Sequence, residues 1–252
     1  PAAILFDLLN GGNKSRMQEH TYFEFGKMAA ESAGYDCPLG NIGAGTGAKA
    51  GTLKGGIGTA SLQQSAKDSY NNSKRGSKSF KVGALAVVNP FGSVTIPYSR
   101  DFWAWPFEQN DEFGGRSAPK IFGDSTSDKG KNCKNLSLDF DFESPLLREE
   151  QFSEKSTVDR VSTNTTLCVV ATDAALTKSQ AQRVAIMAQD GLARALRPVH
   201  APQDGDTVFA LSTTGSSDVA ALVPIEILAR LGALAADCTA RAIARGVFEA
   251  ES

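Results

Sequence analysis

The residues best suited to chemistry form the short sequence Asn164-Thr165-Thr166, which precedes an apolar, β-branched run typical of a buried strand. A hydroxyl at Thr165 can attack the preceding carbonyl carbon, shift the acyl group from nitrogen to oxygen, and let water break the chain. The new N-terminal Thr165 would carry a nucleophilic hydroxyl and an α-amine, whose ordinary pKa of about 7.7–8.0 suits a base. The pattern predicts self-cleavage followed by N-terminal nucleophile catalysis, although a plain turn into a strand also fits these residues.

Two further segments carry polar side chains next to expected strands. Asp204-Gly205-Asp206 fits a turn, or a carboxylate pair of which one member orients the nucleophile and its ammonium; the ligand pattern of a calcium loop is absent. Asn89 stands before Pro90, where it either ends a strand or donates its amide hydrogen to an oxyanion.

A glycine-dense block spans residues 40–58 and includes Lys49 and Lys54. It is superficially similar to a dinucleotide-binding fingerprint, but no strand–turn–helix unit frames it and no acidic residue follows at the required spacing. Close backbone packing beside an active site is the alternative. Its lysines fit solvated surface charges, or groups that lower a nearby pKa or orient a hydroxyl.

Composition narrows the class of protein. The chain has 252 residues, 41% of them hydrophobic and 21% charged, with a net charge of −2. This suffices for one or two globular domains and gives no electrostatic reason to expect nucleic acid or an anionic membrane as partner. No apolar run is long enough to span a bilayer and no leader is visible, so a cytoplasmic location is expected. Two histidines and four scattered cysteines predict no metal site and no cofactor, and Cys168 and Cys238 are expected to be buried free thiols.

The remaining sequence predicts a mixture of helices and strands. A capping box at Thr177 and Gln180 opens one helix, and Pro224 stands near the start of the last one. A long polar loop or partly disordered insertion is expected at about 98–162, with Trp103 and Trp105 pinning its start. The expected helices are 21–33, 177–197 and 219–248, and the expected strands are 81–88, 167–172 and 207–212.

Four segments in order, NIGAGTGAKAGTLKGGIGTAS, VGALAVVNPFGSV, NTTLCVVATDAALTKSQAQRVAIMAQDGLARALRPVHAPQDGDTVFALST and the alanine-rich end, resemble the DmpA/β-peptidyl aminopeptidase family. Its members are hydrolases of the N-terminal-nucleophile type that mature by self-cleavage. The resemblance implies an α+β fold, a four-layer αββα sandwich, cut into an α-chain portion (1–164) and a β-chain (165–252). The family has a further stretch upstream of the core-like start PAAILFDLL, so the sandwich is expected to be incomplete on its N-terminal side.

The resemblance also implies roles for individual residues. Thr165 would be the nucleophile and its freed amine the base, and Asn89 would stabilise the oxyanion. Asp204 and Asp206 would orient the nucleophile. A family lysine near the nucleophile corresponds to Lys54, with Lys49 as the other choice.

The implied activity is that of an amidohydrolase or aminopeptidase that releases N-terminal residues from short peptides or amides through a threonine acyl-enzyme. Two alternatives stay open: a pantetheine or ω-amino-amide hydrolase of the same family, and an uncleaved, noncatalytic relative that acts as a binding module. The expected partners are a small peptide or amide substrate and further copies of the processed αβ unit in a homo-oligomer.

Overall fold

The computed structural model describes residues 2–8, 10, 13, 20–64, 79–97, 99–115, 164–214 and 223–251. Its centre is a four-stranded sheet of order β3-β4-β5-β6, in which β3, β4 and β5 are antiparallel and β5 and β6 are parallel. The four strands are β3 (Ile57–Gln64), β4 (Phe80–Asn89), β5 (Thr165–Thr172) and β6 (Thr207–Ser212). The parallel pair needs a crossover, which α2 (Lys178–Ala188) and α3 (Asp190–Ala195) provide.

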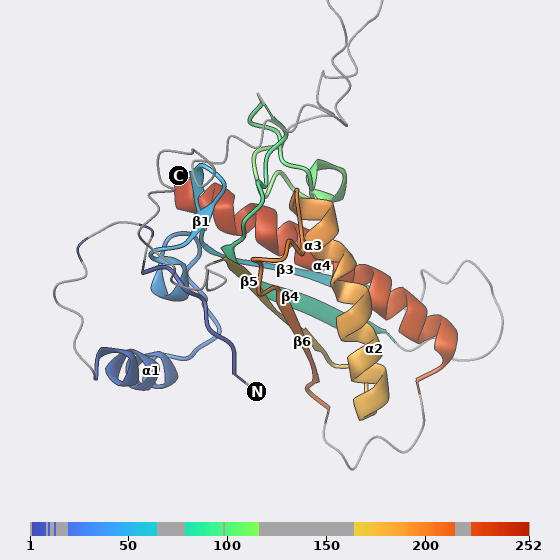
Figure 1. Ribbon diagram of the computed structural model, residues 1–252. Coiled ribbons are helices and arrows are strands. Elements are labelled where there is room, and N and C mark those ends of the chain that lie inside the picture. Colours follow the sequence, from blue (N-terminus) through green and yellow to red (C-terminus); the bar gives the residue numbers. More distant parts are fainter. Residues whose placement is uncertain are drawn as a thin grey trace, which may run out of the picture.

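The three helices α2, α3 and α4 (Ile225–Glu251) cover one face of this sheet (Figure 1). Helix α4 lies along β3 and β4, while α2 and α3 pack beside it. Alternate residues of β5 point to this layer: Cys168 and Val170 are completely or almost completely buried. The intervening residues Leu167, Val169 and Ala171 point to the other face and are half-buried. The sheet therefore has one face in the helical core.

The glycine-dense block forms tight backbone contacts. It contains the 3-10 helix η1 (Gly43–Gly45) and a hairpin of β1 (Lys49–Ala50) and β2 (Leu53–Lys54), and it leads into β3. A side chain at Gly58 would place its Cβ 2.0 Å from the carbonyl oxygen of Ala242 in α4. The block therefore brings backbones together, as the packing interpretation expected, and it opens a strand instead of the helix that a dinucleotide fingerprint requires.

Most predicted elements are confirmed, with shifted ends. The capping box at Thr177 is present, but the helix that it opens ends at Ala188, and a separate α3 follows. Helix α4 begins directly after Pro224, and residues 219–222 of the predicted helix lie outside the described residues. Helix α1 (Thr21–Glu31) is present and none of its residues is buried.

The first part of the insertion expected at about 98–162 is irregular in structure but closely packed. Residues 99–115 pack on the core through Phe102, Ala104 and Phe113, which are all buried. Glu112 forms a two-point ion pair with Arg241 of α4. A few apolar anchors and one buried ion pair therefore hold a segment that is polar in composition. Residues 116–162 of the predicted insertion lie outside the described residues.

The two tryptophans at the start of that segment lie in different surroundings. The guanidinium of Arg197 lies 4.7 Å from the centre of the Trp103 ring, a cation–π contact. Trp105 begins the 3-10 helix η3 (Trp105–Phe107).

Cys168 and Cys238 are buried free thiols, as predicted. Burial raises the pKa of both thiols, that of Cys238 to about 12. Among the described helices, none combines the length and apolar character needed to cross a membrane.

Candidate active site

Thr165 is the first residue of β5, a central strand with β4 on one side and β6 on the other. Its side chain is buried, and its Oγ1 donates a hydrogen bond of 2.5 Å to the carbonyl oxygen of Asn164. The hydroxyl thus lies against the carbonyl group of the peptide bond that precedes it. This is the neighbourhood that an attack on the Asn164 carbonyl carbon requires.

Gly205 supplies a second donor to the same carbonyl. Its main-chain N–H donates to the Asn164 oxygen at 2.9 Å, beside a parallel bridge between Asn164 and Asp204. A Cβ on Gly205 would stand only 2.8 Å from Oγ1 of Thr165. Position 205 therefore combines a main-chain donor on the Asn164 carbonyl with the absence of a side chain that would crowd the Thr165 hydroxyl.

Asp206 holds the backbone just after Thr165. Its Oδ1 accepts a hydrogen bond of 2.8 Å from the N–H of Thr166, and its Oδ2 lies 3.0 Å from Nδ1 of His200. The Asp206 side chain is only 2% exposed. Its carboxylate is thus buried: Oδ1 binds the main chain of Thr166 in β5, and Oδ2 contacts the imidazole of His200.

Asp204 reaches across the start of β5. Its Oδ1 accepts a hydrogen bond of 2.9 Å from the N–H of Phe91, which follows β4. Because β5 lies between β4 and β6, this contact passes over the end of β5 where Thr165 lies. The other oxygen, Oδ2, is buried and has no hydrogen-bond partner.

The protonation of Asp204 follows from this burial. Desolvation raises the pKa of its carboxyl to about 6, opposed by the Phe91 N–H and reinforced by the negative charge of Asp206. A carboxyl with this pKa exchanges a proton near neutral pH. It is therefore suited to general acid–base work at this end of the sheet.

Asn89 lies opposite Thr165 in the register of β4 and β5. Cross-strand partners point to the same face, so the two side chains are neighbours. The amide is completely buried: its Oδ1 accepts from the N–H of Lys49 at 2.9 Å and from Asn10 Nδ2 at 3.1 Å. Its Nδ2 donates to the carbonyl oxygen of Phe6 at 3.1 Å. Because Oδ1 of Asn89 accepts two hydrogen bonds, the orientation of the amide group is fixed, and Nδ2 is its hydrogen-bond donor.

The lysines of the glycine block have different surroundings. Nζ of Lys54 lies 3.4 Å from the carbonyl oxygen of Ala250, near the carboxyl end of α4, where the helix dipole favours a cation. Lys49 contacts the site through its main chain, by the bond to Asn89. The structure therefore brings Thr165, Asn89 and the two aspartates together, while the recorded contact of the Lys54 ammonium is with α4.

Sequence reasoning missed three contributors: Gly205, His200 and the N–H of Phe91. Signals for two of them were present, since a glycine separates the two aspartates and a histidine stands six residues before Asp206. The donor role of Phe91 depends on the contact between the segment that follows β4 and the segment that precedes β6, which no local pattern records.

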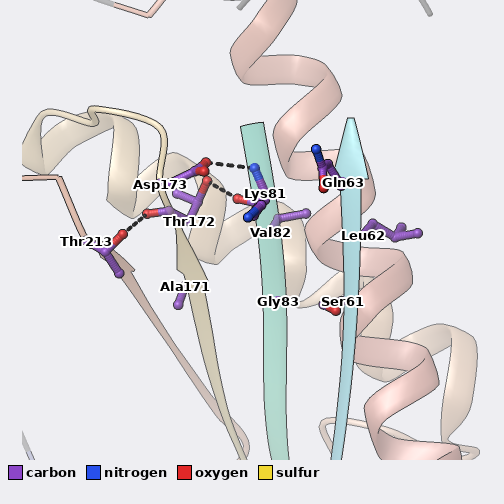
Figure 2. Close-up of a pocket in the computed structure, with 10 residues that line it drawn as sticks. All are labelled: Ser61, Leu62, Gln63, Lys81, Val82, Gly83, Ala171, Thr172, Asp173 and Thr213. Atoms are coloured by element: carbon purple, nitrogen blue, oxygen red, sulfur yellow. Dashed lines mark hydrogen bonds between the residues drawn. The ribbon is translucent and has the colours of Figure 1, made fainter. Parts of the chain in front are cut away.

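A cavity of about 470 Å³ opens at the opposite end of the sheet, lined by Lys81, Thr172 and Thr213 among others (Figure 2). Thr172 ends the strand that Thr165 begins, so seven steps of about 3.3 Å separate the two residues by roughly 23 Å. The hydrogen bonds drawn there join Asp173 and Thr172 to the main chain of Lys81, and Thr213 to the main chain of Thr172. They tie strand ends together and offer no nucleophile with a base.

Known structures share this fold. The PH0078 protein from Pyrococcus horikoshii OT3 aligns over 87% of this chain and 47% of its own, with 23% identity and a TM-score of 0.51. The L-aminopeptidase D-Ala-esterase/amidase from Ochrobactrum anthropi, described as a variant among the Ntn hydrolase fold, aligns over 86% and 47%, with 21% identity and a TM-score of 0.50. The fold is thus of the Ntn hydrolase class. The predicted α+β class is confirmed, and the described residues supply the four-stranded sheet, the two-stranded β1–β2 hairpin and the helical layer on one face of the larger sheet.

The family follows from the sequence match. The model of peptidase family S58 matches residues 2–252, and this chain belongs to that family. It is 37% identical over 259 residues to the uncharacterized aminopeptidase Rv1333 of Mycobacterium tuberculosis, covering 100% of this chain and 63% of that protein. It is 36% identical over 270 residues to the uncharacterized aminopeptidase ML1167 of Mycobacterium leprae, covering 61% of that protein. The chain thus spans less than two thirds of the length of these relatives.

Proposed function

We propose that the protein is a self-processing aminopeptidase or amidohydrolase whose nucleophile is Thr165. The observation that carries the proposal is the hydroxyl of Thr165 bonded at 2.5 Å to the carbonyl oxygen of Asn164. Membership in a peptidase family and the aminopeptidase names of relatives support hydrolysis of peptide or amide bonds. Activity and substrate belong to the whole protein, of which this chain provides the nucleophile strand and its neighbours.

Maturation begins with attack of Oγ1 on the carbonyl carbon of Asn164. The hydroxyl proton passes to Asp204, and the oxyanion that forms on the Asn164 oxygen is stabilised by the N–H of Gly205. The carbon–nitrogen bond then breaks, and Asp204 returns the proton to the nitrogen of Thr165, which leaves an ester between the two residues. Water hydrolyses this ester to the Asn164 carboxylate and the free hydroxyl of Thr165. Asp204 suits this transfer because its pKa is about 6 and its backbone pairs with that of Asn164, beside the bond to be cut.

Turnover uses the amine that maturation creates. The α-amine of Thr165 takes the hydroxyl proton while Oγ1 attacks the substrate carbonyl, and it then gives that proton to the leaving amine. Water releases the acid from the acyl-enzyme by the reverse transfer. Asn89, cross-strand from Thr165, supplies its Nδ2–H to the oxyanion, a role for which its fixed amide orientation is suited.

The test compares the whole protein with Thr165→Ala and Thr165→Ser. Thr165→Ala should abolish self-cleavage and turnover, since no hydroxyl remains, whereas Thr165→Ser should keep both. p-Nitroanilides of L-, D- and β-amino acids, assayed beside pantetheine and 6-aminohexanoate oligomers, separate aminopeptidase action from pantetheine or ω-amino-amide hydrolysis. A Thr165→Ala variant with full activity overturns the proposal. Light scattering of the processed protein tests the accompanying expectation of a homo-oligomer.

A further inference from the structure

His200 lies in a loop that the fold holds against the nucleophile strand. The backbone of Ser93, after β4, exchanges two hydrogen bonds with that of Arg197, at 2.8 and 3.0 Å. A Cβ on the adjacent Gly92 would stand 2.0 Å from the carbonyl oxygen of Pro198, so the two backbones touch. The loop that carries His200 is thereby fixed on the segment that follows β4.

The backbone of His200 itself is strained. Its φ is +52°, in the left-handed region that residues other than glycine adopt uncommonly. This conformation is strained for a residue that carries a Cβ. In it, the imidazole Nδ1 lies 3.0 Å from Oδ2 of Asp206, and the main-chain N–H lies 3.4 Å from the same oxygen.

The contact extends to the nucleophile. Asp206 binds the N–H of Thr166 through its Oδ1, and Thr166 is covalently joined to Thr165. The Asp206 side chain is 2% exposed and that of His200 is 44% exposed, so the imidazole is the solvent-facing partner of a buried carboxylate. Without the imidazole, the carboxylate loses the side-chain contact that opposes rotation about its terminal bond. Rotation would take Oδ1 away from the Thr166 amide.

We propose that His200 is a positioning residue: its Nδ1–H fixes the Asp206 carboxylate, which in turn holds the Thr165–Thr166 backbone so that Oγ1 stays on its target carbonyl. This inference rests on the proposed role of Thr165. It predicts that loss of the imidazole slows both self-cleavage and turnover, because both use the same hydroxyl. Solvent can replace part of the lost contact at so exposed a side chain, so the expected loss is about tenfold.

The variants separate the hydrogen bond from backbone strain and from charge. His200→Gly removes the side chain and relieves the strain of the positive φ. His200→Phe keeps a ring and the strain but removes the donor. His200→Asn places an amide N–H near the position of Nδ1, tolerates the positive φ and carries no charge. The charge matters because a positive His200 also lowers the pKa of Asp204. His20→Gly is the matched control, since this other histidine stands before α1, exposed and without a side-chain capping bond.

The measurements are the half-time of cleavage at residues 164–165, kcat and KM for one amide substrate, and the melting temperature. We expect His200→Gly and His200→Phe to lower the cleavage rate and kcat about tenfold with KM within about twofold, and His200→Asn to recover to within about threefold of wild type. His20→Gly should match wild type. Either His200→Gly or His200→Phe decides the outcome if the other does not fold.

Two results overturn the inference. Wild-type rates in a folded His200→Gly or His200→Phe variant would show that the imidazole positions nothing. Failure of His200→Asn to recover would show that the side chain acts through its charge. Failure of the proposed function is distinguishable from both, because the wild-type protein itself would then remain uncut or inactive.

Discussion

Gly205→Ala tests the geometry of the nucleophile most sharply, because it adds one methyl group beside Thr165. The added Cβ would stand 2.8 Å from Oγ1 of Thr165 and 3.7 Å from its Cγ2. A carbon atom and a non-bonded heavy atom prefer a separation of about 3.5 Å or more, so Oγ1 of Thr165 must move by roughly 0.7 Å. The position of Gly205 does not require a positive φ, so alanine adds crowding without backbone strain.

A movement of this size takes Oγ1 away from the Asn164 carbonyl. Misplacement of a reacting group by about 1 Å costs around 100-fold in rate. The displaced strand also loses part of the contact between the Gly205 N–H and the Asn164 oxygen, and loss of one oxyanion donor costs about 100-fold to 1,000-fold. We therefore expect self-cleavage of Gly205→Ala to be slower by about 100-fold or more.

The assay follows precursor and product by intact mass after cell-free synthesis of the whole protein. Gly26→Ala is the matched control, since its added Cβ in α1 meets no atom within 4 Å and should leave the cleavage rate unchanged. Cleavage of Gly205→Ala at the wild-type rate would refute the placement of Thr165 against Asn164. A melting temperature close to wild type confirms that a slow rate reflects geometry and not unfolding.

Three further predictions concern charge and burial. The raised pKa of Asp204, about 6, means that ionisation destabilises the folded state: the free energy of unfolding should fall as pH rises from about 4 to 6. Asp204→Asn should reduce this fall by about 1–2 kcal/mol after allowance for solvent screening, as measured by urea unfolding at each pH; an unchanged pH dependence would contradict it. Glu112→Gln leaves the Arg241 guanidinium, which is 5% exposed, without its carboxylate and should lower the free energy of unfolding by about 3 kcal/mol, as measured with denaturant. An unchanged unfolding midpoint would show that the ion pair does not stabilise the fold. Cys37, which is exposed, should react with iodoacetamide in the folded protein while Cys168 does not, since burial keeps the Cys168 thiol inaccessible and its pKa raised; equal labelling in a mass spectrum would contradict the burial.

Much of the site was predictable because its residues stand at strand ends. Asn89 ends one strand and Thr165 begins the next one in the sheet, while Asp204 and Asp206 precede a third, parallel to the second. These strand ends lie at the same end of the sheet, so local strand patterns are enough to predict that the residues lie close together. The surroundings of Lys54 were not predictable, because a long flexible side chain reaches whichever partner the tertiary fold offers, here α4.

The parts of the fold that escaped prediction depend on tertiary contacts. Residues 99–115 are polar in composition, yet Phe102 and Phe113 anchor them in the core and Glu112 meets Arg241, distant in sequence. The division between α2 and α3 lies beside Gly191, where a Cβ would approach the Ala236 carbonyl oxygen of α4 to 2.3 Å. The sequence pattern that predicts one helix over 177–197 does not record that close approach.

The central claim is that the bond between Asn164 and Thr165 is cut and that Thr165 then performs the chemistry. Intact-mass measurement and N-terminal sequencing of the purified, active whole protein test it most directly. The account predicts two chains, the smaller of which begins with Thr165 and carries a free α-amine. A fully active protein whose chain is continuous from Asn164 to Thr165 would contradict it.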